Sequence, residues 1–364
     1  MTMIIARAPL RISFAGGGTD LPAYYERHGG AVLSTTITRS VYAVLSQGDY
    51  EQVQIISSDY QAIHVGRPQT YEDSESLALP WAIVQAMGLE RGASILLASE
   101  VPPGTGLGSS SATAIALIAA IAAFQKQPYA REQLAELAAQ IEIVRLGQPI
   151  GKQDQYAAAF GGVNLFSFSA DGVDATPVPL SAEVRRGLET HLALYFTGST
   201  RQARAILQEQ RRRSAVGESH TIEALHAMKA QVAPMRRALE SGDYAGIGEL
   251  LHEAWHLKRQ VSSGISTGAI DQAYGAARSA GAFGGKITGA GGGGFLLLLV
   301  PPAAQDSVRA ALQPLGLRPM RFGLEPRGAY TIVAEDDRPD VAVLDGRTAA
   351  RAIDERAGTL DGRI

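Results

Sequence analysis

Apolar and polar positions alternate over roughly the first seventy residues, as in strands whose two faces meet different surroundings. Four strands are expected there: ARAPLRISF, AVLSTTI, SVYAVLSQ and QVQIISS. One short helix is expected among them at 21–28. The apolar spacing then changes to that of helices, with one strand between them at 93–101. The expected helices span 76–87, 110–124 and 131–145.

The second half of the chain begins with a predicted hairpin at 161–180 and the strand HLALYFTG. Helical spacing continues from 201 to about 281. A glycine-rich strand region, a helix near 306–312 and a strand pair, RPMRFGLE and AYTIVAE, complete the pattern. We therefore expect two α+β domains and a charged tail that is either a late helix or irregular. Their predicted ranges are 1–185, 186–335 and 336–364.

Composition narrows the class of protein. The 364 residues are 46% apolar, which excludes a disordered chain, and they include no Cys, which excludes disulfides, thiolate metal sites and Cys nucleophiles. A formal net charge of −3 gives no reason to expect nucleic acid as a partner. The N-terminus lacks the apolar segment of a signal peptide, and the apolar run at 112–124 is too short to span a bilayer. We expect a cytoplasmic protein with no membrane partner.

Three glycine-rich segments each adjoin a predicted strand: RAPLRISFAGGGTDLP, PPGTGLGSSSATA and KITGAGGGGF. Glycines let the backbone approach an anion closely, and a following helix adds the positive end of its dipole. The second segment is not a P-loop, because it has no Lys before Lys126, and it is not a dinucleotide fingerprint, because Ser109 replaces the third Gly. Convergence of the three segments on one anionic ligand explains the entropic cost of so many glycines.

The three segments, in this order, resemble the three motifs of the GHMP kinases, which transfer the γ-phosphoryl group of ATP to a small-molecule hydroxyl. The resemblance implies an α+β fold of two domains: an N-terminal ATP-binding domain with a mixed sheet and a ferredoxin-like C-terminal domain. Within the family, LGQPIGKQDQYAAAFGG and HEAWHLKR resemble kinases of heptose phosphates. The expected reaction is phosphorylation of the anomeric hydroxyl of a sugar phosphate, for the synthesis of a nucleotide-activated heptose. Another sugar 1-kinase, such as a fucokinase, is the alternative.

The same resemblance assigns site residues. Asp154 matches the general base and Arg11 its cationic companion, a role that Arg7 is expected to share. Ser110 and Glu142 match ligands of magnesium. The residues matched to ATP phosphate binding are Pro103, Gly104, Gly106, Leu107, Gly108, Ser109, Ser110 and Ser111. Those matched to substrate binding are Asp20, Gly17, Gly18, Gly289, Gly291 and Gly292.

One departure from the family bears on the substrate. Galactokinases carry a Glu-His pair where this chain has Gly17 and Gly18, which leaves room for a larger sugar and argues against galactose. A second phosphate on that sugar requires cations. The candidates in the sequence are Arg39, Lys152, Arg201 and Lys286.

Two other functions compete with the kinase. HEAWH at 252–256 matches the HExxH pattern of zinc proteases, but no third ligand follows at the expected spacing. The second competing function is that of a kinase-like sensor, which binds nucleotide and sugar without turnover. The joint presence of Ser110, Glu142 and Asp154 favours the enzyme, because a sensor does not need all three.

Overall fold

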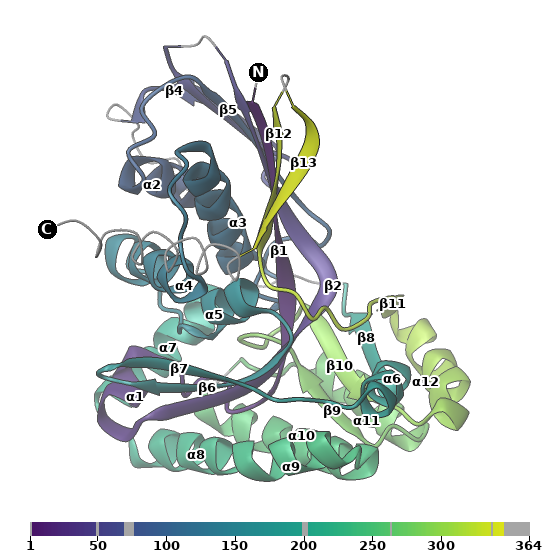
Figure 1. Cartoon of the computed structure of the whole chain (residues 1–364). Helices are drawn as coiled ribbons and strands as arrows, with labels where there is room; N and C mark the ends of the chain where they lie inside the picture. Colours follow the sequence, from purple (N-terminus) through teal and green to yellow (C-terminus); the bar gives the residue numbers. More distant parts are fainter. Residues whose placement is uncertain are drawn as a thin grey trace, which may run out of the picture.

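Two long antiparallel strands form the centre of the structure, β1 (Thr2–Ala15) and β2 (Gly30–Gln47) (Figure 1). The computed structural model describes residues 2–48, 51–68, 76–198, 203–262, 264–335 and 338–345. Strand β2 joins the two strands expected at AVLSTTI and SVYAVLSQ. Its first part pairs with β6 (Val163–Ser169) and its last part with β5 (Ala93–Ser99), so that one strand serves two branches of the sheet.

The large sheet has nine strands in the order β13-β12-β1-β2-β5-β3-β4, with β6 and β7 branching from β2. Strands β3 and β5 run parallel while the other pairs are antiparallel, which confirms the expected mixed sheet. The remaining strands are β3 (Val53–Ser57), β4 (Ala62–Gly66), β7 (Gly172–Pro177), β12 (Tyr330–Glu335) and β13 (Arg338–Asp345).

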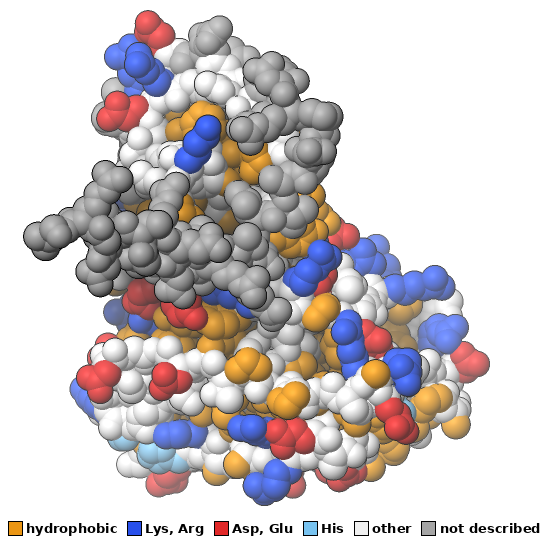
Figure 2. All heavy atoms as spheres, viewed as in Figure 1, with side chains coloured by type: hydrophobic (Ala, Val, Ile, Leu, Met, Phe, Trp, Pro, Cys, Tyr) orange, Lys and Arg blue, Asp and Glu red, His pale blue; other side chains and the backbone are white. Residues whose placement is uncertain are grey.

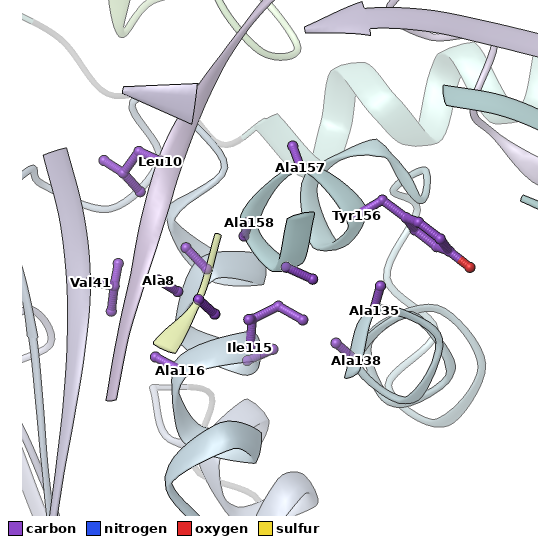
Figure 3. Close-up of a cluster of buried hydrophobic side chains, with 14 of the residues drawn as sticks. Ala8, Leu10, Val41, Ile115, Ala116, Ala135, Ala138, Tyr156, Ala157 and Ala158 are labelled. Atoms are coloured by element: carbon purple, nitrogen blue, oxygen red, sulfur yellow. The ribbon is translucent and has the colours of Figure 1, made fainter. Parts of the chain in front are cut away.

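Helices cover one side of this sheet. The alanine-rich α3 (Ser109–Phe124) packs directly on β1 and β2, because its small side chains let the helix backbone approach the strands. Figure 3 shows Ile115 of α3 between Ala8 of β1 and two alanines of a neighbouring helix, Ala135 and Ala138. The helices of this layer are α2 (Ala78–Ala86), α3, α4 (Arg131–Ala139), the π-helix η2 (Gln140–Arg145) and α5 (Gln153–Phe160).

A second, antiparallel sheet has four strands in the order β11-β8-β10-β9. These are β8 (Leu192–Phe196), β9 (Gly284–Ile287), β10 (Phe295–Leu299) and β11 (Arg318–Met320). Helices connect β8 to β9, a tight loop connects β9 to β10, and a helix connects β10 to β11. This connectivity and strand order are those of a ferredoxin-like βαββαβ unit, as expected.

The helices of this part are α7 (Ala203–Ala215), α8 (Ser219–Ala230), α9 (Val232–Ser241), α10 (Tyr244–Val261), α11 (Gly268–Ser279) and α12 (Gln305–Leu312). Among them, α10, α11 and α12 pack against the second sheet, and α8, α9 and α10 lie below β6 and β7 in the view of Figure 1. Two short helices connect strands, α1 (Pro22–His28) between β1 and β2 and α6 (Ala182–His191) between β7 and β8. Single 3₁₀ turns occupy η3 (Pro302–Ala304) and η4 (Gln313–Leu315).

The C-terminal end of the fold differs from the sequence expectation. The strands expected at RPMRFGLE and AYTIVAE do not pair, because β11 pairs with β8 and β12 pairs with β1. The expected second domain, 186–335, therefore ends in a strand of the first sheet. The expected domain boundary near residue 185 stays a prediction. The tail expected at 336–364 includes β13, which pairs with β12 and is neither a helix nor irregular; its other residues lie outside the described ones.

The two sheets share one hydrophobic core. Leu297 and Leu299 of β10 belong to the cluster that contains β1, β2 and α3, whereas Leu296 and Leu298 face a second cluster under α11 and α12. This alternation follows from the period of two in a strand. Loops at the ends of both sheets are thereby held in fixed positions relative to each other.

The face of the molecule shown in Figure 2 carries side chains of both charges. On the side shown in Figure 2, Lys and Arg side chains are interspersed with Asp and Glu. Among the described residues, no helix has the length and apolar character needed to cross a bilayer.

Candidate active site

Four segments that are distant in sequence meet in one cleft. The cleft lies between the first part of the fold, which is built on the nine-stranded sheet, and the second part, which is built on the four-stranded sheet. The four segments are the loop after β1, the loop between β5 and α3, the start of α5, and the loop between β9 and β10. Predicted site residues that line the cleft are Arg11, Gly17, Gly18, Asp20, Gly104, Gly106, Gly108, Ser109, Ser110, Asp154 and Gly289. The convergence expected of the three glycine-rich segments is therefore present.

The loop before α3 consists of glycines with left-handed backbone. Gly104, Gly106 and Gly108 have φ of 74°, 79° and 79°, which other residues adopt only with strain. A Cβ on Gly106 would lie 2.6 Å from the carbonyl oxygen of Thr288, and one on Gly289 would lie 2.4 Å from the Cα of Gly106. The second and third glycine loops are thus in direct backbone contact and form one wall of the cleft.

Three other predicted residues of this loop lie away from the cleft. Leu107 is fully buried in the core, and its carbonyl accepts a 3.0 Å hydrogen bond from the backbone N–H of Arg11. Ser111 is buried on the first turn of α3. Neither Leu107, Ser111 nor Pro103 lines the cleft. Because α3 begins at Ser109, the positive end of its dipole faces the cleft, which suits an anion.

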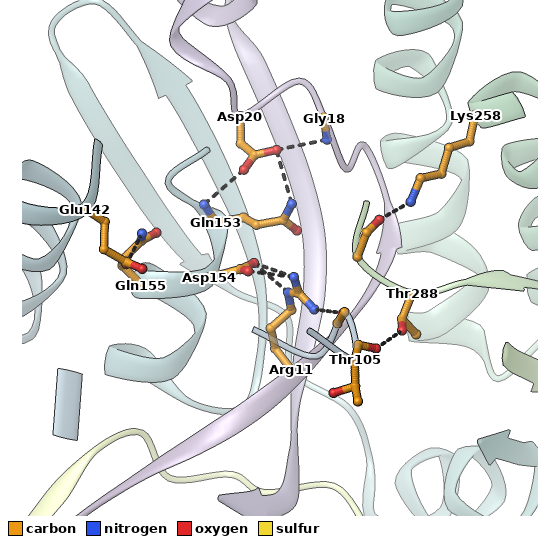
Figure 4. A network of polar contacts seen from close by, with 12 residues as sticks. Arg11, Gly18, Asp20, Thr105, Glu142, Gln153, Asp154, Gln155, Lys258 and Thr288 are labelled. Carbon is orange, nitrogen blue, oxygen red and sulfur yellow. Dashed lines mark hydrogen bonds and ion pairs between the residues drawn. The ribbon is translucent and has the colours of Figure 1, made fainter. Parts of the chain in front are cut away.

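Asp154 and Arg11 form a bidentate ion pair at the centre of the cleft (Figure 4). Arg11 Nε donates to Asp154 Oδ1 and Nη2 donates to Oδ2, both at 2.7 Å, while Nη1 donates to the carbonyl of Gly106, also at 2.7 Å. A Cβ on Gly108 would lie 3.3 Å from the Asp154 carboxyl, so no side chain separates this carboxylate from the loop. The carboxylate is held in one orientation beside the glycine loop, and a general base for a hydroxyl requires such fixed positioning.

Asp20 is buried beside this pair. It accepts hydrogen bonds from the backbone N–H of Gly18 at 2.9 Å and from the backbone and side chain of Gln153 at 3.2 Å each. A Cβ at Gly151 would lie 2.0 Å from Asp20 Oδ2, so glycine is required there. Burial raises the pKa of Asp20, and the negative charge of Asp154 raises it further. This carboxyl is suited to binding a hydroxyl group.

Two polar atoms at the cleft have no hydrogen-bond partner among the described residues: Ser13 Oγ and Gln153 Oε1. Sequence reasoning missed both as binding residues. Ser13 has the same strand parity as Arg11, and Gln153 adjoins Asp154, and these were the available signals. Unpaired buried polar atoms are rare, so these two indicate contacts with a bound polar molecule.

Glu142 lies behind Ser110 rather than on the cleft surface. It belongs to the π-helix η2, a form often found at functional sites. Its carboxylate accepts hydrogen bonds of 2.7 Å from Ser110 Oγ and from Gln155 Nε2, and burial raises its pKa. No Lys or Arg pairs with it in the part of the chain that the structure describes. A buried carboxylate beside a hydroxyl is an oxygen donor set that suits magnesium.

Two lysines of the second part of the fold also line the cleft, Lys258 of α10 and Lys286 of β9. Lys258 donates to the carbonyl of Gly289, and Lys286 donates to the carbonyl of Phe14 at 3.0 Å. Burial and then the charge of Arg11 lower the pKa of Lys258 to about 8. Burial, together with the charge of Lys258, also lowers the pKa of Lys286 well below its ordinary value.

Most of the other cations proposed from the sequence lie elsewhere. Arg39 binds the carbonyl of Arg321 and the carboxylate of Glu100, and Lys152 pairs with Glu136 at 2.9 Å. Neither lines the cleft. Arg201 lies outside the described residues. Of the four candidates for a second phosphate, Lys286 is the one found at the cleft.

Arg7 does not share the role of Arg11. It pairs with Glu325 at 2.7 Å and does not line the cleft. The two arginines have the same strand parity, but four residues of a strand span about 13 Å, which separates their side chains along β1.

Gly291 and Gly292 shape the third loop without lining the cleft. The N–H of Gly292 donates to the carbonyl of Ile265 at 2.8 Å, and a Cβ on Gly291 would lie 2.9 Å from Ile265. That these two glycines contact the substrate stays a prediction, and neither lies among the residues that line the cleft. They hold the loop against the segment after α10 so that Gly289 reaches the cleft.

The HEAWH segment lies on α10. His252 shares a 2.6 Å hydrogen bond with the Tyr274 hydroxyl, and Glu253 accepts one of 3.1 Å from Gln231. No group of three or more His, Asp or Glu side chains that could hold a metal occurs among the described residues. The segment has a packing role here, and a zinc protease site is not supported.

Comparisons with known proteins agree with this geometry. Two family models match the chain, the GHMP kinases N terminal domain at residues 78–162 and the GHMP kinases C terminal model at 235–315. The chain is 32% identical over 308 residues to a D-glycero-alpha-D-manno-heptose 7-phosphate kinase of Campylobacter jejuni, covering 80% of this chain and 87% of that protein.

Two further proteins are similar. The crystal structure of a D-glycero-D-manno-heptose 1-phosphate kinase from Bacteroides thetaiotaomicron matches with a TM-score of 0.75 at 28% identity, covering 90% of this chain and 98% of that one. An L-fucokinase/L-fucose-1-P guanylyltransferase of Bacteroides fragilis is 27% identical over 303 residues, which are 74% of this chain and 32% of that longer protein.

Proposed function

Because the chain belongs to the GHMP kinase family and is a phosphotransferase with a sugar hydroxyl as its acceptor, we propose that it phosphorylates the anomeric hydroxyl of D-glycero-D-manno-heptose 7-phosphate. The product is the 1,7-bisphosphate, an intermediate suited to the synthesis of a nucleotide-activated heptose. Similarity to the Campylobacter heptose 7-phosphate kinase over most of both chains supports this choice of sugar. The observation that carries the chemistry is the Asp154–Arg11 pair facing the glycine loop.

ATP binds with its phosphates along the loop 103–111 and the N-terminus of α3. Backbone N–H groups of left-handed glycines and the helix dipole supply partial positive charge there. The wall formed by Gly106 and Gly289 keeps side chains away from the phosphates. This arrangement explains how the loop binds a triphosphate without the lysine of a P-loop.

Asp154 takes the proton of the anomeric hydroxyl while the sugar oxygen bonds to the γ-phosphorus of ATP. The bond from this phosphorus to the bridging oxygen breaks, and ADP leaves with that electron pair. Arg11 fixes the carboxylate through two hydrogen bonds of 2.7 Å and adds positive charge beside the reacting groups. An anomeric hydroxyl is more acidic than an ordinary alcohol, which suits a carboxylate base.

The sugar is held by the polar groups on the other side of Asp154. Asp20 accepts from sugar hydroxyls, and the unpartnered oxygens of Ser13 and Gln153 provide further hydrogen bonds. Gly17 and Gly18 contribute backbone only, which leaves room for a seven-carbon sugar. Lys286, with its ammonium group at the cleft, is available to an anionic substrate.

Ser110 and Glu142 are the residues that would hold magnesium. Their oxygens are hydrogen-bonded to each other at 2.7 Å, and Glu142 has no cationic partner among the described residues, so the donor set fits a hard divalent ion. At this position the ion would supply positive charge to the ATP phosphates.

The test is ATP-dependent phosphorylation of heptose 7-phosphate beside fucose, mannose, galactose and mevalonate, with phosphorus NMR of the product. A new anomeric phosphate on the heptose 7-phosphate alone supports the proposal. Preferential phosphorylation of fucose favours the fucokinase alternative, for which the Bacteroides fragilis relative is the supporting observation. Absence of turnover with every sugar, despite ATP binding, favours the sensor.

A further inference from the structure

Lys258 reaches the reaction centre from the second part of the fold. It lies on α10, and its ammonium group donates to the carbonyl of Gly289 in the third glycine loop. Figure 4 shows its side chain extending from the helix toward this loop, across the cleft from Asp20. None of the roles assigned above uses this ammonium group.

No carboxylate forms an ion pair with Lys258 among the described residues, although the negative charge of Asp20 partly offsets the lowering of its pKa. The positive charge of Arg11 is paired with Asp154, which accepts two of its three hydrogen bonds. Lys258 and Lys286 bond only to backbone carbonyls among the described residues. An ammonium group removed from water without a carboxylate is costly, and the lowered pKa of Lys258, about 8, reflects that cost. An anion bound beside Lys258 would offset this cost of burying its charge.

A continuous series of contacts joins Lys258 to the base. Its partner Gly289 touches Gly106, whose carbonyl accepts from Arg11, and Arg11 holds Asp154. Lys258 therefore lies beside the point where the nucleotide loop and the base meet. The nucleotide loop itself contains no Lys or Arg between Pro103 and Ser111. The anion in question is a phosphate group of one of the two substrates.

We propose that Lys258 is a catalytic residue that binds the phosphoryl group in transit from ATP to the sugar. It stays protonated, forms no covalent bond, and donates hydrogen bonds to the non-bridging oxygens while the bond to ADP breaks and the bond to the sugar oxygen forms. The proton of the sugar hydroxyl goes to Asp154. This assignment rests on the proposed position of the ATP phosphates at the glycine loop, and it does not depend on which sugar is the acceptor.

The kinetic test compares Lys258→Met and Lys258→Arg with Lys229→Met. Lys229 is a matched control, because its ammonium also bonds to a backbone carbonyl, that of His28 at 2.7 Å, but outside the cleft. Removal of one group that stabilises transition-state charge typically costs roughly 10²–10³ in kcat. We expect a loss of this size for Lys258→Met, partial recovery for Lys258→Arg and wild-type kinetics for Lys229→Met.

The acceptor distinguishes the two possible sources of the phosphate. A loss of kcat that is equal for a phosphorylated sugar and its unphosphorylated analogue supports binding of the transferred group. A raised KM confined to the phosphorylated sugar, with kcat kept, assigns Lys258 to the acceptor's own phosphate and overturns the proposal. Kinetics within about twofold of wild type overturn it as well.

A measurement of nucleotide binding tests the role of Lys258 in the absence of any sugar. ADP with magnesium and aluminium fluoride mimics the nucleotide with a phosphoryl group in transit. In Lys258→Met we expect ADP to bind as in the wild type, whereas the gain in affinity from aluminium fluoride falls at least about tenfold. An unchanged gain overturns the role of Lys258. Failure of the wild type to bind ADP contradicts the proposed function instead, so the two failures are distinguishable.

Discussion

Replacement of Asp154 by Asn tests the proposed base with the smallest change of shape. Asn keeps one oxygen for Arg11 but turns an NH₂ group toward the guanidinium, so one of the two 2.7 Å hydrogen bonds is lost. Arg11 is only 4% exposed and then has no carboxylate partner. The variant removes the proton acceptor, and it also leaves a buried cation unpaired.

Both effects have an expected size. Loss of a general base lowers kcat by roughly 10²–10⁴, which corresponds to about 2.7–5.5 kcal/mol of transition-state stabilisation. Loss of a hydrogen bond between charged groups lowers the free energy of unfolding by about 1.5–3 kcal/mol. Domains are stable by roughly 5–15 kcal/mol, so the Asp154→Asn protein is expected to fold.

The assay measures ADP release at saturating ATP and sugar, ATP affinity by calorimetry, and unfolding in urea. Asp271→Asn serves as the control, because Asp271 lies outside the cleft, where it pairs with Arg259 at 3.2 Å and accepts a 2.6 Å hydrogen bond from Ser266, so its loss is expected to leave turnover unchanged. We expect ATP affinity of the Asp154 variant within about threefold of wild type. Turnover within threefold of wild type, with both substrates bound, would refute the role of Asp154 as the base.

Three further outcomes are expected. Gly106→Ala should raise the KM for ATP at least about tenfold, because the new Cβ would lie 2.6 Å from a backbone carbonyl oxygen. Gly88 has a similar φ but open space around it, so Gly88→Ala should lower the stability of the protein without changing its ATP kinetics. Equal ATP kinetics in the two variants would contradict this prediction. Glu142→Gln should raise the magnesium concentration needed for turnover. Burial raises the pKa of Glu142, so the stability that its protonated form gives the wild type is present below pH 4.5 and is lost as the pH rises through that raised pKa. Glu142→Gln should therefore be more stable than the wild type without metal, by an amount that grows above pH 4.5. Urea unfolding from pH 4.5 to 8 measures this difference in stability, and a difference that does not change with pH refutes the explanation. Galactose should be a poor substrate because Gly17 and Gly18 offer it no side chains, and efficient galactose phosphorylation in the sugar panel would overturn that reasoning.

Local features of the chain were readable from the sequence. The glycine loops, the alanine-rich helix α3 and strands such as β3, β5, β8 and β12 follow from residue types a few positions apart, and their predicted bounds are close to the observed ones. The bounds of β1 and β11 differ more, β2 combines two expected strands, and β4 has no counterpart among the expected ones. The pairing of Arg11 with Asp154 was not derivable from spacing, because the two residues are 143 positions apart. It came from the family resemblance. The pairing of β12 with β1 is equally non-local, and no periodicity within either strand indicates it.

Lys258 was missed although a local signal existed. Leu251, Ala254 and Trp255 are buried on one stripe of α10, and Lys258 continues that stripe at the spacing of an amphipathic helix. A lysine in an apolar stripe is placed away from bulk solvent, which is unfavourable unless an anion comes with it. The sequence alone therefore shows a lysine in an apolar stripe, but only the structure shows that the stripe ends at the cleft.

The contacts at the floor of the cleft determine how the site is assembled. Thr288 Oγ1 donates to the carbonyl of Thr105 at 3.2 Å, and Lys286 donates to the carbonyl of Phe14 at 3.0 Å, so hydrogen bonds join the two parts of the fold beside the nucleotide loop. Together with the backbone contact between Gly106 and Gly289, they prevent the second and third glycine loops from separating independently. Donors fixed in this way need no reorganisation when charge develops on the transferred group, which is the condition under which electrostatic stabilisation contributes most to the rate. The position of Lys258, bonded to the same third loop, places its charge within this fixed set.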